Sequence, residues 1–358
     1  MSNMMNKAQG FGLSLITKIA GSEVLDQLKL RKFVEKSLYQ GSKTGFKVLN
    51  KTQKAFKPQA IDKQRLPNQV NKNLFDLSLT EEQQMTVDAM SQFAEEVLYA
   101  LAHEADHQAQ FPEQLWQHLV DLGLNYYALP EALGGVAAEQ NIVSNILIAE
   151  SLAKGDFSLT AGLLSTFSVI NAITRWGSTQ VQSMYLPVFA EDTDITATFA
   201  FQEATPAFNP FQLKTNATEQ NGQMTITGEK TLVILGDTAD VFLVSAEFNG
   251  QPYIFVVQCD ESISIKANPA MGLKAAETAT LHFNQTPALG LGDADFDYTA
   301  FVDLGNLMWC AMAIGTCEAI KAYCIKYANE RTAFGEPISH RQSVAFMISD
   351  MAIEIDAM

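Results

Sequence analysis

The sequence predicts an α+β multidomain protein, in which helices come first, strands follow and helices return. Apolar residues recur at helical spacing over 76–194, alternate with polar residues over 195–290, and recur at helical spacing again over 291–358. Helices and strands that are grouped along the chain, rather than alternating, are typical of this class. At 358 residues the chain also exceeds the usual length of one domain.

Charge separates an N-terminal segment from the rest of the chain. Residues 1–74 hold 14 Lys and Arg against 4 Asp and Glu, a net charge of +10, whereas the remaining residues hold 10 against 36, a net charge of −26. We expect residues 1–75 to be a basic amphipathic arm and linker. The arm could contact an anionic membrane surface, nucleic acid or the acidic body, or pack one helix on that body. The acidic body itself argues against nucleic acid as a partner.

Helix signals organise residues 76–194. Thr80 and Gln83 form a capping box at the start of the first expected helix, and a second helix over 112–122 ends at Gly123. Two further helices are expected over 138–154 and 159–176. No uninterrupted apolar run of about 18 residues is present, which argues against a membrane span, and no convincing secretory signal precedes the first domain.

The next region is rich in Val, Ile, Thr and Phe in short segments separated by Asn-Gly or Gly turns, a pattern that predicts an antiparallel sandwich or barrel. The expected strands are 195–201, 212–217, 223–228, 231–235, 241–246, 253–258, 262–266 and 278–283. Helices return over 298–329 and from 343 to the end. We therefore expect a middle β domain over 195–290 and a helical domain over 291–358.

Metal and thiol chemistry is weakly indicated. His103, Glu104 and His107 form an H-E-x-x-H sequence, which on a helix could hold zinc, but the polar residues after it favour an exposed helix end. Cys310, Cys317 and Cys324 recur every seven residues, too far apart to share one metal ion or a disulfide. We expect them to form a buried stripe on one helix, and His282 to lie on the solvent face of a strand.

A set of short motifs, each weak alone, occurs in a characteristic order and resembles the acyl-CoA dehydrogenase family over residues 78–358. The motifs are Thr80-Glu81-Glu82-Gln83, Leu122-Gly123-Leu124, Pro130-Glu131, Gly134-Gly135, Gly177 with Leu186-Pro187, Glu203, Gly228-Glu229-Lys230, Met271-Gly272 with Phe283 and Pro287, and Arg331-Thr332-Ala333-Phe334-Gly335 with Gln342. The resemblance implies a flavoprotein with a helical N-terminal domain, a middle antiparallel β domain and a C-terminal four-helix domain, here partial.

The resemblance also implies a reaction. Family members remove the α-hydrogen of an acyl-CoA thioester as a proton and deliver the β-hydrogen as hydride to FAD, as in fatty-acid β-oxidation. The proton goes to a Glu carboxylate whose basicity rises where water is excluded. Hydrogen bonds to the thioester oxygen stabilise the negative charge that develops there.

Site residues are assigned by position in the family motifs. The resemblance assigns Arg331 to the FAD pyrophosphate across a dimer, Phe334 to packing on the cofactor, and Gln342 to its adenosine part. Asp303 occupies the position that contacts the adenine of CoA. Phe201, Gln202, Leu232, Ile234 and Phe208 occupy the positions that face flavin and substrate, so the first four are assigned to the cofactor and Phe208 to the substrate.

The sequence departs from the family at the flavin and at the base. Phe208 replaces a serine, and Leu232-Val233-Ile234 replaces a Trp-Ile-Thr or Trp-Ile-Ser element that packs on the flavin ring. Gly305 and Asn306 replace the Glu and Arg that some members carry early in their long helix. We therefore assign no catalytic residue and no metal ligand, and expect the last two helices of the family's C-terminal domain to be missing.

These observations lead to one favoured hypothesis and two alternatives. We expect an FAD-dependent acyl-CoA dehydrogenase that acts with an electron-transfer acceptor, as a homodimer or tetramer. One alternative is a partner subunit or acyl-CoA binder that has lost flavin, and the other is an inactive truncated chain. The expected location is cytoplasmic, with the basic arm contacting the inner membrane surface.

Overall fold

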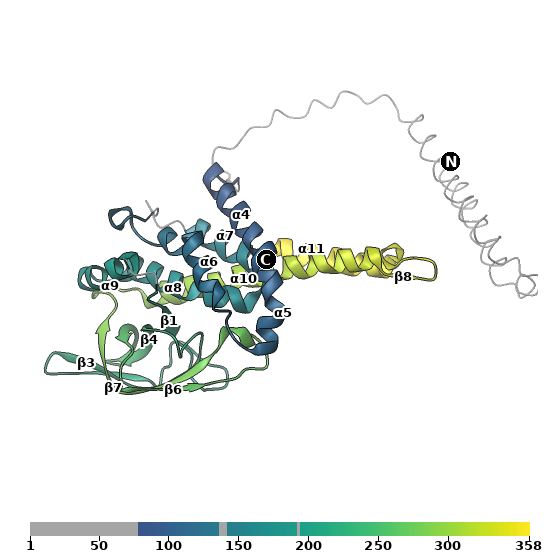
Figure 1. Ribbon diagram of the computed structural model, residues 1–358. Helices are drawn as coiled ribbons and strands as arrows, with labels where there is room; N and C mark the ends of the chain where they lie inside the picture. Colours follow the sequence, from purple (N-terminus) through teal and green to yellow (C-terminus); the bar gives the residue numbers. More distant parts are fainter. Residues whose placement is uncertain (1–77, 136–141, 192–193) are drawn as a thin grey trace, which may run out of the picture. The chain divides into compact units, whose positions relative to one another are not determined.

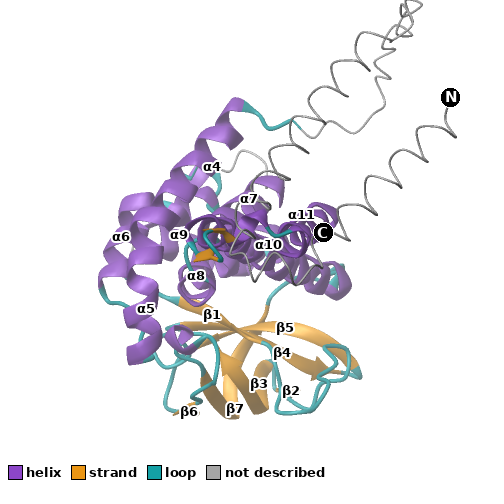
Figure 2. Ribbon diagram, turned by 90° about the vertical axis from the view of Figure 1, so that its right-hand side faces the viewer, coloured by secondary structure: helices purple, strands orange, loops and turns teal. Residues whose placement is uncertain are grey.

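The computed structural model describes residues 78–135, 142–191 and 194–358, and residues 78–358 form one compact unit. The expected arm and linker, residues 1–75, lie outside the described residues. Helices gather on one side of a seven-stranded sheet (Figures 1 and 2). The order of helices, strands and helices confirms the predicted α+β class.

The first helices follow the predicted signals. Helix α4 (Glu81–Phe93) begins at the predicted capping box, in which the Thr80 hydroxyl accepts the Gln83 N–H at 3.2 Å and the Gln83 side chain accepts the Thr80 N–H at 3.0 Å. A π-helical turn, Ala94–Leu98, leads into α5 (Tyr99–Gln108), which ends at Ala109 in a left-handed conformation with φ of 53°.

The remaining helices of this layer include one that was not predicted. They are α6 (Gln114–Leu122), ended by Gly123 as expected, then α7 (Ile142–Ala153), α8 (Phe157–Trp176) and α9 (Thr179–Glu191). The first residues of the expected helix 138–154 lie outside the described part of the chain. Sequence patterns missed α9 because Pro187, which has no N–H to donate, lies inside it. Its buried Val181, Tyr185 and Phe189 hold the helix against the core.

The sheet closes on itself. Its strands are β1 (Ala197–Ala200), β2 (Asn216–Gln220), β3 (Gln223–Val233), β4 (Val241–Phe248), β5 (Gln251–Gln258), β6 (Ile263–Ala267) and β7 (Ala279–Gly290). Six of them run in the order β1-β4-β2-β3-β7-β5, with a further β4–β5 pairing that completes the closure, and β6 pairs with β7 off this path. Two expectations were wrong in detail: β1 pairs with β4 in parallel, and the strands expected at 223–228 and 231–235 are one strand with two register shifts.

Strand β4 lies between two cores. Val241 and Leu243 pack with the helical layer, whereas Phe242 and Val244 pack with the opposite face of the sheet. All four side chains are buried, so the strand reads as a continuous apolar run rather than an alternating one. One of these cores is therefore shared by the helices and the facing side of the sheet, so any cavity between them is bounded by close-packed side chains.

Helix α10 (Tyr298–Glu330) crosses this core and continues beyond it. A small hairpin of β8 (Thr332–Ala333) and β9 (Glu336–Pro337) joins it to α11 (Gln342–Ala357). Helices α8 and α10 are long and apolar enough to cross a membrane by length and composition; 78% of the apolar window of α8 is buried, against 28% for α10. Core helices of globular proteins pass the same test. The expected burial of the cysteines on α10 was wrong, since Cys310 is exposed and Cys317 and Cys324 are half-buried.

Candidate functional site

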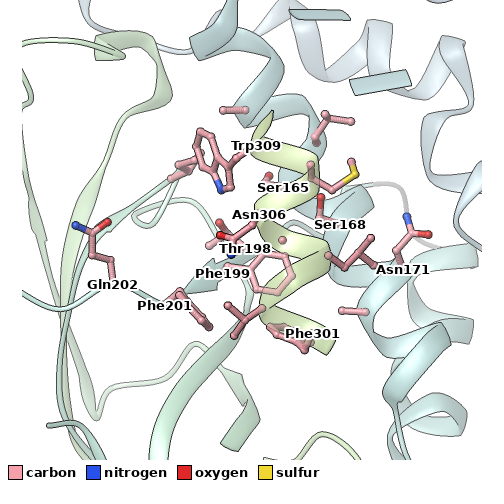
Figure 3. A pocket seen from close by; sticks show the side chains of 18 of the residues that line it. Ser165, Ser168, Asn171, Thr198, Phe199, Phe201, Gln202, Phe301, Asn306 and Trp309 are labelled. Carbon is pink, nitrogen blue, oxygen red and sulfur yellow. The ribbon is translucent and has the colours of Figure 1, made fainter. Parts of the chain in front are cut away.

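A cavity of about 480 Å³ lies where the helical layer, the sheet and α10 meet (Figure 3). Its walls come from α7 and α8, from β1 and the residues after it, from the end of β3, and from the first turns of α10. Large apolar side chains dominate these walls, among them Trp176, Phe199, Phe301, Met308 and Trp309. An apolar cavity with a few polar groups, formed where domains meet, is typical of a small-molecule site.

The structure brings together the residues predicted to face flavin and substrate. Phe201, Gln202, Phe208, Leu232 and Ile234 all line the cavity. They belong to two chain segments, one after β1 and one at the end of β3, which meet at this cavity. Gly305 and Asn306, the positions where the catalytic Glu and its neighbouring Arg occur in some family members, line it as well.

The side chains that differ from the family contribute apolar surface to this cavity. Phe208 is half-buried and its ring meets that of Phe201 edge to face at 6.1 Å. Leu232 is 41% exposed and has a left-handed backbone, with φ of 53°, which is uncommon for a residue other than glycine. A Cβ atom added at Gly305 would meet no other part of the chain within 4 Å. The cavity is therefore open at the point where a carboxylate would stand.

The other predicted site residues lie outside this cavity. Arg331, Phe334 and Gln342 lie beyond the far end of α10 and are exposed, Phe334 to 97%. The Arg341 guanidinium lies over the Phe334 ring at 5.3 Å. Asp303 is on α10 among cavity residues, but its side chain is exposed. These assignments remain predictions, and a loop this exposed is available to a neighbouring subunit.

Polar groups on the helical side of the cavity were not predicted. Asn145 Nδ2 donates to Asn171 Oδ1 at 2.9 Å, and Asn171 Nδ2 donates to the Phe167 carbonyl at 2.9 Å. Ser165 and Ser168 line the cavity from α8, the helix that also carries Asn171. Asn171 and Gln202 occupy opposite sides of the cavity (Figure 3). In the sequence, these polar groups are indicated by the Ser and Asn residues that interrupt the apolar run of α8.

Titratable side chains are absent from the part of the cavity lining that the structure describes. None of the described residues that line it is Asp, Glu, His, Lys, Arg, Cys or Tyr. Its polar atoms are amides and hydroxyls, which orient a ligand by hydrogen bonds but do not accept a proton near neutral pH. The described part of the site can therefore bind and orient a ligand, but it does not supply a general base.

Two other motifs lie away from the cavity. His103, Glu104 and His107 are exposed on α5, and within 78–135, 142–191 and 194–358 no three His, Cys, Asp or Glu side chains are close enough to hold a metal ion. The motif therefore lies near an exposed helix end, which is the interpretation that the sequence favoured. His282 is exposed on β7 as predicted, with its Nδ1 3.1 Å from Glu229 Oε2.

The fold and the cavity define a class of three-part α+β protein with an apolar cavity where its helices and its sheet meet. The chain belongs to the acyl-CoA dehydrogenase family, a family of flavoproteins: the family's N-terminal domain matches residues 80–193 and its C-terminal domain matches residues 298–358. This family membership confirms the predicted resemblance.

Known relatives agree with this assignment. Cyclohex-1-ene-1-carbonyl-CoA dehydrogenase of Geobacter metallireducens is 28% identical over 294 residues, which cover 78% of this chain and 76% of that protein. The solved structure of butyryl-CoA dehydrogenase from Megasphaera elsdenii has a TM-score of 0.71 at 26% identity, covering 79% and 78% of the two chains. A structure described as an electron transferring flavoprotein of Acidaminococcus fermentans has a TM-score of 0.70 at 26% identity, covering 79% and 77%.

Proposed function

We propose that this protein takes part in FAD-dependent α,β-dehydrogenation of an acyl-CoA thioester. The observation that carries the proposal is the convergence of Phe201, Gln202, Leu232 and Ile234 with Gly305 on one apolar cavity. These positions are far apart in the sequence; the resemblance assigns the first four to the flavin, and Gly305 to the place where some members carry the catalytic Glu. The relatives named as acyl-CoA dehydrogenases support the same reaction class.

The character of the lining residues supports FAD as the cofactor. The cavity is apolar and lined by aromatic rings, and amide groups of Gln202 and Asn306 lie on its walls, as a flat heteroaromatic ring requires. Phe201, Gln202, Leu232 and Ile234 would hold the ring of the cofactor, which when bound supplies the hydride-accepting chemistry. Arg331 would meet the pyrophosphate of the cofactor in a neighbouring subunit, because a guanidinium binds phosphate oxygens in a bidentate manner.

The protein's own residues would bind and orient the acyl group. Rings and methionines of α8 and α10 exclude water from the chain of the substrate, and the hydroxyls and amides on α7 and α8 fix its orientation. Proton removal requires a carboxylate, which the described lining residues do not contribute. Under this proposal the reaction needs a carboxylate that these lining residues do not supply.

Partners and location follow as further proposals. The exposed β8–β9 loop supports assembly into a dimer or tetramer in which it reaches a second cofactor site. The structural neighbour described as an electron transferring flavoprotein supports an electron-transfer acceptor. The excess of 14 Lys and Arg over 4 Asp and Glu in residues 1–74 supports contact between the arm and the anionic inner surface of a membrane, with the protein in the cytoplasm.

The proposal is tested with the purified 358-residue protein. FAD is added, free cofactor is removed by gel filtration, and the flavin spectrum and the binding of octanoyl-CoA are measured. We expect FAD to be retained and octanoyl-CoA to perturb its spectrum, since both ligands occupy one cavity. A protein that is folded yet retains neither ligand would refute the proposal.

A second candidate is acyl-CoA binding without oxidation, favoured by the absence of a titratable group among the described lining residues. In that case octanoyl-CoA would bind with the same affinity in the presence and absence of FAD. The two candidates differ in one result, because dehydrogenation requires stoichiometric FAD and the binding function does not.

A further inference from the structure

A lysine is completely buried behind the cavity wall. Lys230, on β3, has 0% of its side chain exposed. Its ammonium group donates to Glu203 Oε1 at 2.9 Å, to Ser245 Oγ at 2.9 Å and to the Phe201 carbonyl at 3.2 Å. An ammonium group has three donors, so every donor of Lys230 is used.

The partner carboxylate is equally well satisfied. Glu203 is 4% exposed, its Oε1 also accepts the Thr215 N–H at 2.9 Å, and its Oε2 accepts the Lys214 N–H at 2.8 Å. Ser245 Oγ donates to the Phe201 carbonyl at 2.9 Å. We call Lys230, Glu203 and Ser245 the Lys230 cluster. It joins the end of β1, the chain before β2, β3 and β4.

The Lys230 cluster adjoins the two segments that form the sheet side of the cavity. Its own side chains do not line it, but Phe201 and Gln202 directly precede Glu203, and Leu232 follows Lys230 by two residues. The Thr231 N–H donates to the Gln202 carbonyl at 2.8 Å, which ties these segments to each other. Between Lys230 and Val233 the pairing with β7 shifts register, so regular sheet hydrogen bonds do not fix Leu232.

Stability alone is a weak reason for such a pair. The cost of removing two charges from water commonly cancels their attraction, and apolar residues of similar volume often serve as well. A buried pair does fix geometry, because each donor and acceptor must find its partner at one spacing. Here the fixed spacing is that between residues 201–202 and 232–234, which form one wall of the cavity.

We propose that the Lys230 cluster is a positioning device, which sets the spacing between the two wall segments so that the cavity can hold its ligand. The identity of that ligand, FAD with an acyl-CoA, rests on the proposed function. The positioning role does not, because it can be measured on the protein without ligand.

The test uses a double variant, because single variants leave an unpaired buried charge and can fail to fold. Lys230→Met with Glu203→Gln removes both charges at nearly constant volume. Lys274→Met is the matched control, since it removes a lysine from an exposed salt bridge of 3.2 Å to Asp106. Hydrogen exchange of the full-length proteins is followed by mass spectrometry for peptides that cover 199–208, 229–236 and 251–258.

We expect amide exchange in the double variant to become about tenfold faster or more in 199–208 and 229–236 while 251–258 stays unchanged, because only the wall segments lose their anchor. The control should match the wild type throughout. Unchanged exchange at the wall, or equally faster exchange in all three peptides, would overturn the proposal. If the double variant does not fold, Ser245→Ala is read in the same way, since it removes the two hydrogen bonds of Ser245 Oγ and leaves the ion pair.

A ligand measurement separates this inference from the proposed function. We expect FAD affinity to fall about tenfold in the double variant and to remain unchanged in Lys274→Met, because a misplaced wall loses preorganised contacts. Undiminished FAD affinity in the double variant would count against the positioning role. If the wild type binds no FAD, the proposed function fails while the exchange experiment still decides the role of the Lys230 cluster.

Discussion

At the scale of single residues, burial and pairing have opposite effects on the pKa values of Glu203 and Lys230. Burial alone raises the pKa of Glu203, but the hydrogen bonds from Lys230 and from the Thr215 and Lys214 N–H groups outweigh it, so its pKa lies below the ordinary value. Burial lowers the pKa of Lys230 to about 8, although Glu203 acts against this shift. Both groups are therefore charged at neutral pH, as their contacts require.

These shifts give stability a defined pH dependence. A carboxyl whose pKa is lowered on folding contributes stability above its unfolded pKa, and this contribution is lost as pH falls through the folded pKa. The lowered pKa of Lys230 affects stability in the alkaline range. Between about pH 8 and 10.5 the lysine has lost its proton in the folded protein but keeps it in the unfolded chain, so the free energy of unfolding rises with pH over this range.

We therefore predict that acid weakens the wild type more than the double variant Lys230→Met with Glu203→Gln. The free energy of unfolding, measured by urea titration from about pH 7 down to about pH 3, should fall more steeply in the wild type, because Glu203 takes up a proton over this range and the glutamine that replaces it cannot. Equal slopes for the two proteins would contradict the lowered pKa of Glu203.

A second residue-scale prediction concerns the altered flavin wall. Phe208→Ser together with Leu232→Trp and Ile234→Thr restores the side chains that the family uses. Leu232 is 41% exposed, so a larger ring can be added without overpacking. We predict that FAD affinity, measured by flavin fluorescence, rises about tenfold, because a stacked ring and a hydroxyl donor add contacts. Unchanged affinity would mean that the flavin does not contact these positions.

The sequence predicted one wall of the cavity but not the other. Phe201, Gln202 and Leu232 stand within recognisable motifs, so their place in the site could be inferred. Asn145 and Asn171 could not, because periodicity shows that a helix has an apolar face but not which helices meet. The pairing of Lys230 with Glu203 also depends on strand register, which the two register shifts in β3 obscured.

At the scale of elements, the contact of α10 with α7 depends on a glycine. A Cβ at Gly315 would lie 2.0 Å from the Glu150 carbonyl oxygen. We predict that Gly315→Ala lowers the free energy of unfolding by about 1 to 3 kcal/mol, because the helices must move apart. Gly305→Ala on the same helix is the control: its Cβ meets nothing within 4 Å, and removing a helical glycine should be neutral or stabilising.

The β8–β9 hairpin should act on cofactor binding rather than on folding. Phe334 is 97% exposed, so Phe334→Ala should change the free energy of unfolding by less than about 0.5 kcal/mol. We predict that Arg331→Ala likewise leaves stability unchanged but weakens FAD binding about tenfold, since a phosphate contact is lost. Calorimetric unfolding and FAD titration check both results, and undiminished FAD affinity would refute the assignment of Arg331.

Element positions were predicted well where caps were present. Thr80, Gly123 and the ends of α8 and α10 were recognisable, whereas α9 was not, because its Pro187 reads as a helix breaker. The parallel pairing of β1 with β4 could not be predicted. Alternation of apolar and polar residues shows that a strand has one buried and one exposed face, but it does not show the direction of the neighbouring strand.

At the scale of the whole molecule, the fold is that of its family while the cavity differs from it in chemistry. Residues from α8, β1, β3 and α10 meet around about 480 Å³, and no titratable side chain of the described residues lines that space. The cavity is suited to bind and orient a ligand, and under the proposed function dehydrogenation needs a carboxylate that the described lining residues do not supply. The open space at Gly305 is the place to supply one.

The most direct measurement is therefore the rate at which octanoyl-CoA reduces bound FAD in wild type, Gly305→Glu and Gly305→Gln. We predict that Gly305→Glu is about 100-fold faster or more than the other two, because a general base contributes on that order and the amide has the same size without basicity. Equal rates for Gly305→Glu and Gly305→Gln, or a wild type as fast as Gly305→Glu, would contradict a cavity that binds the substrate but lacks the base.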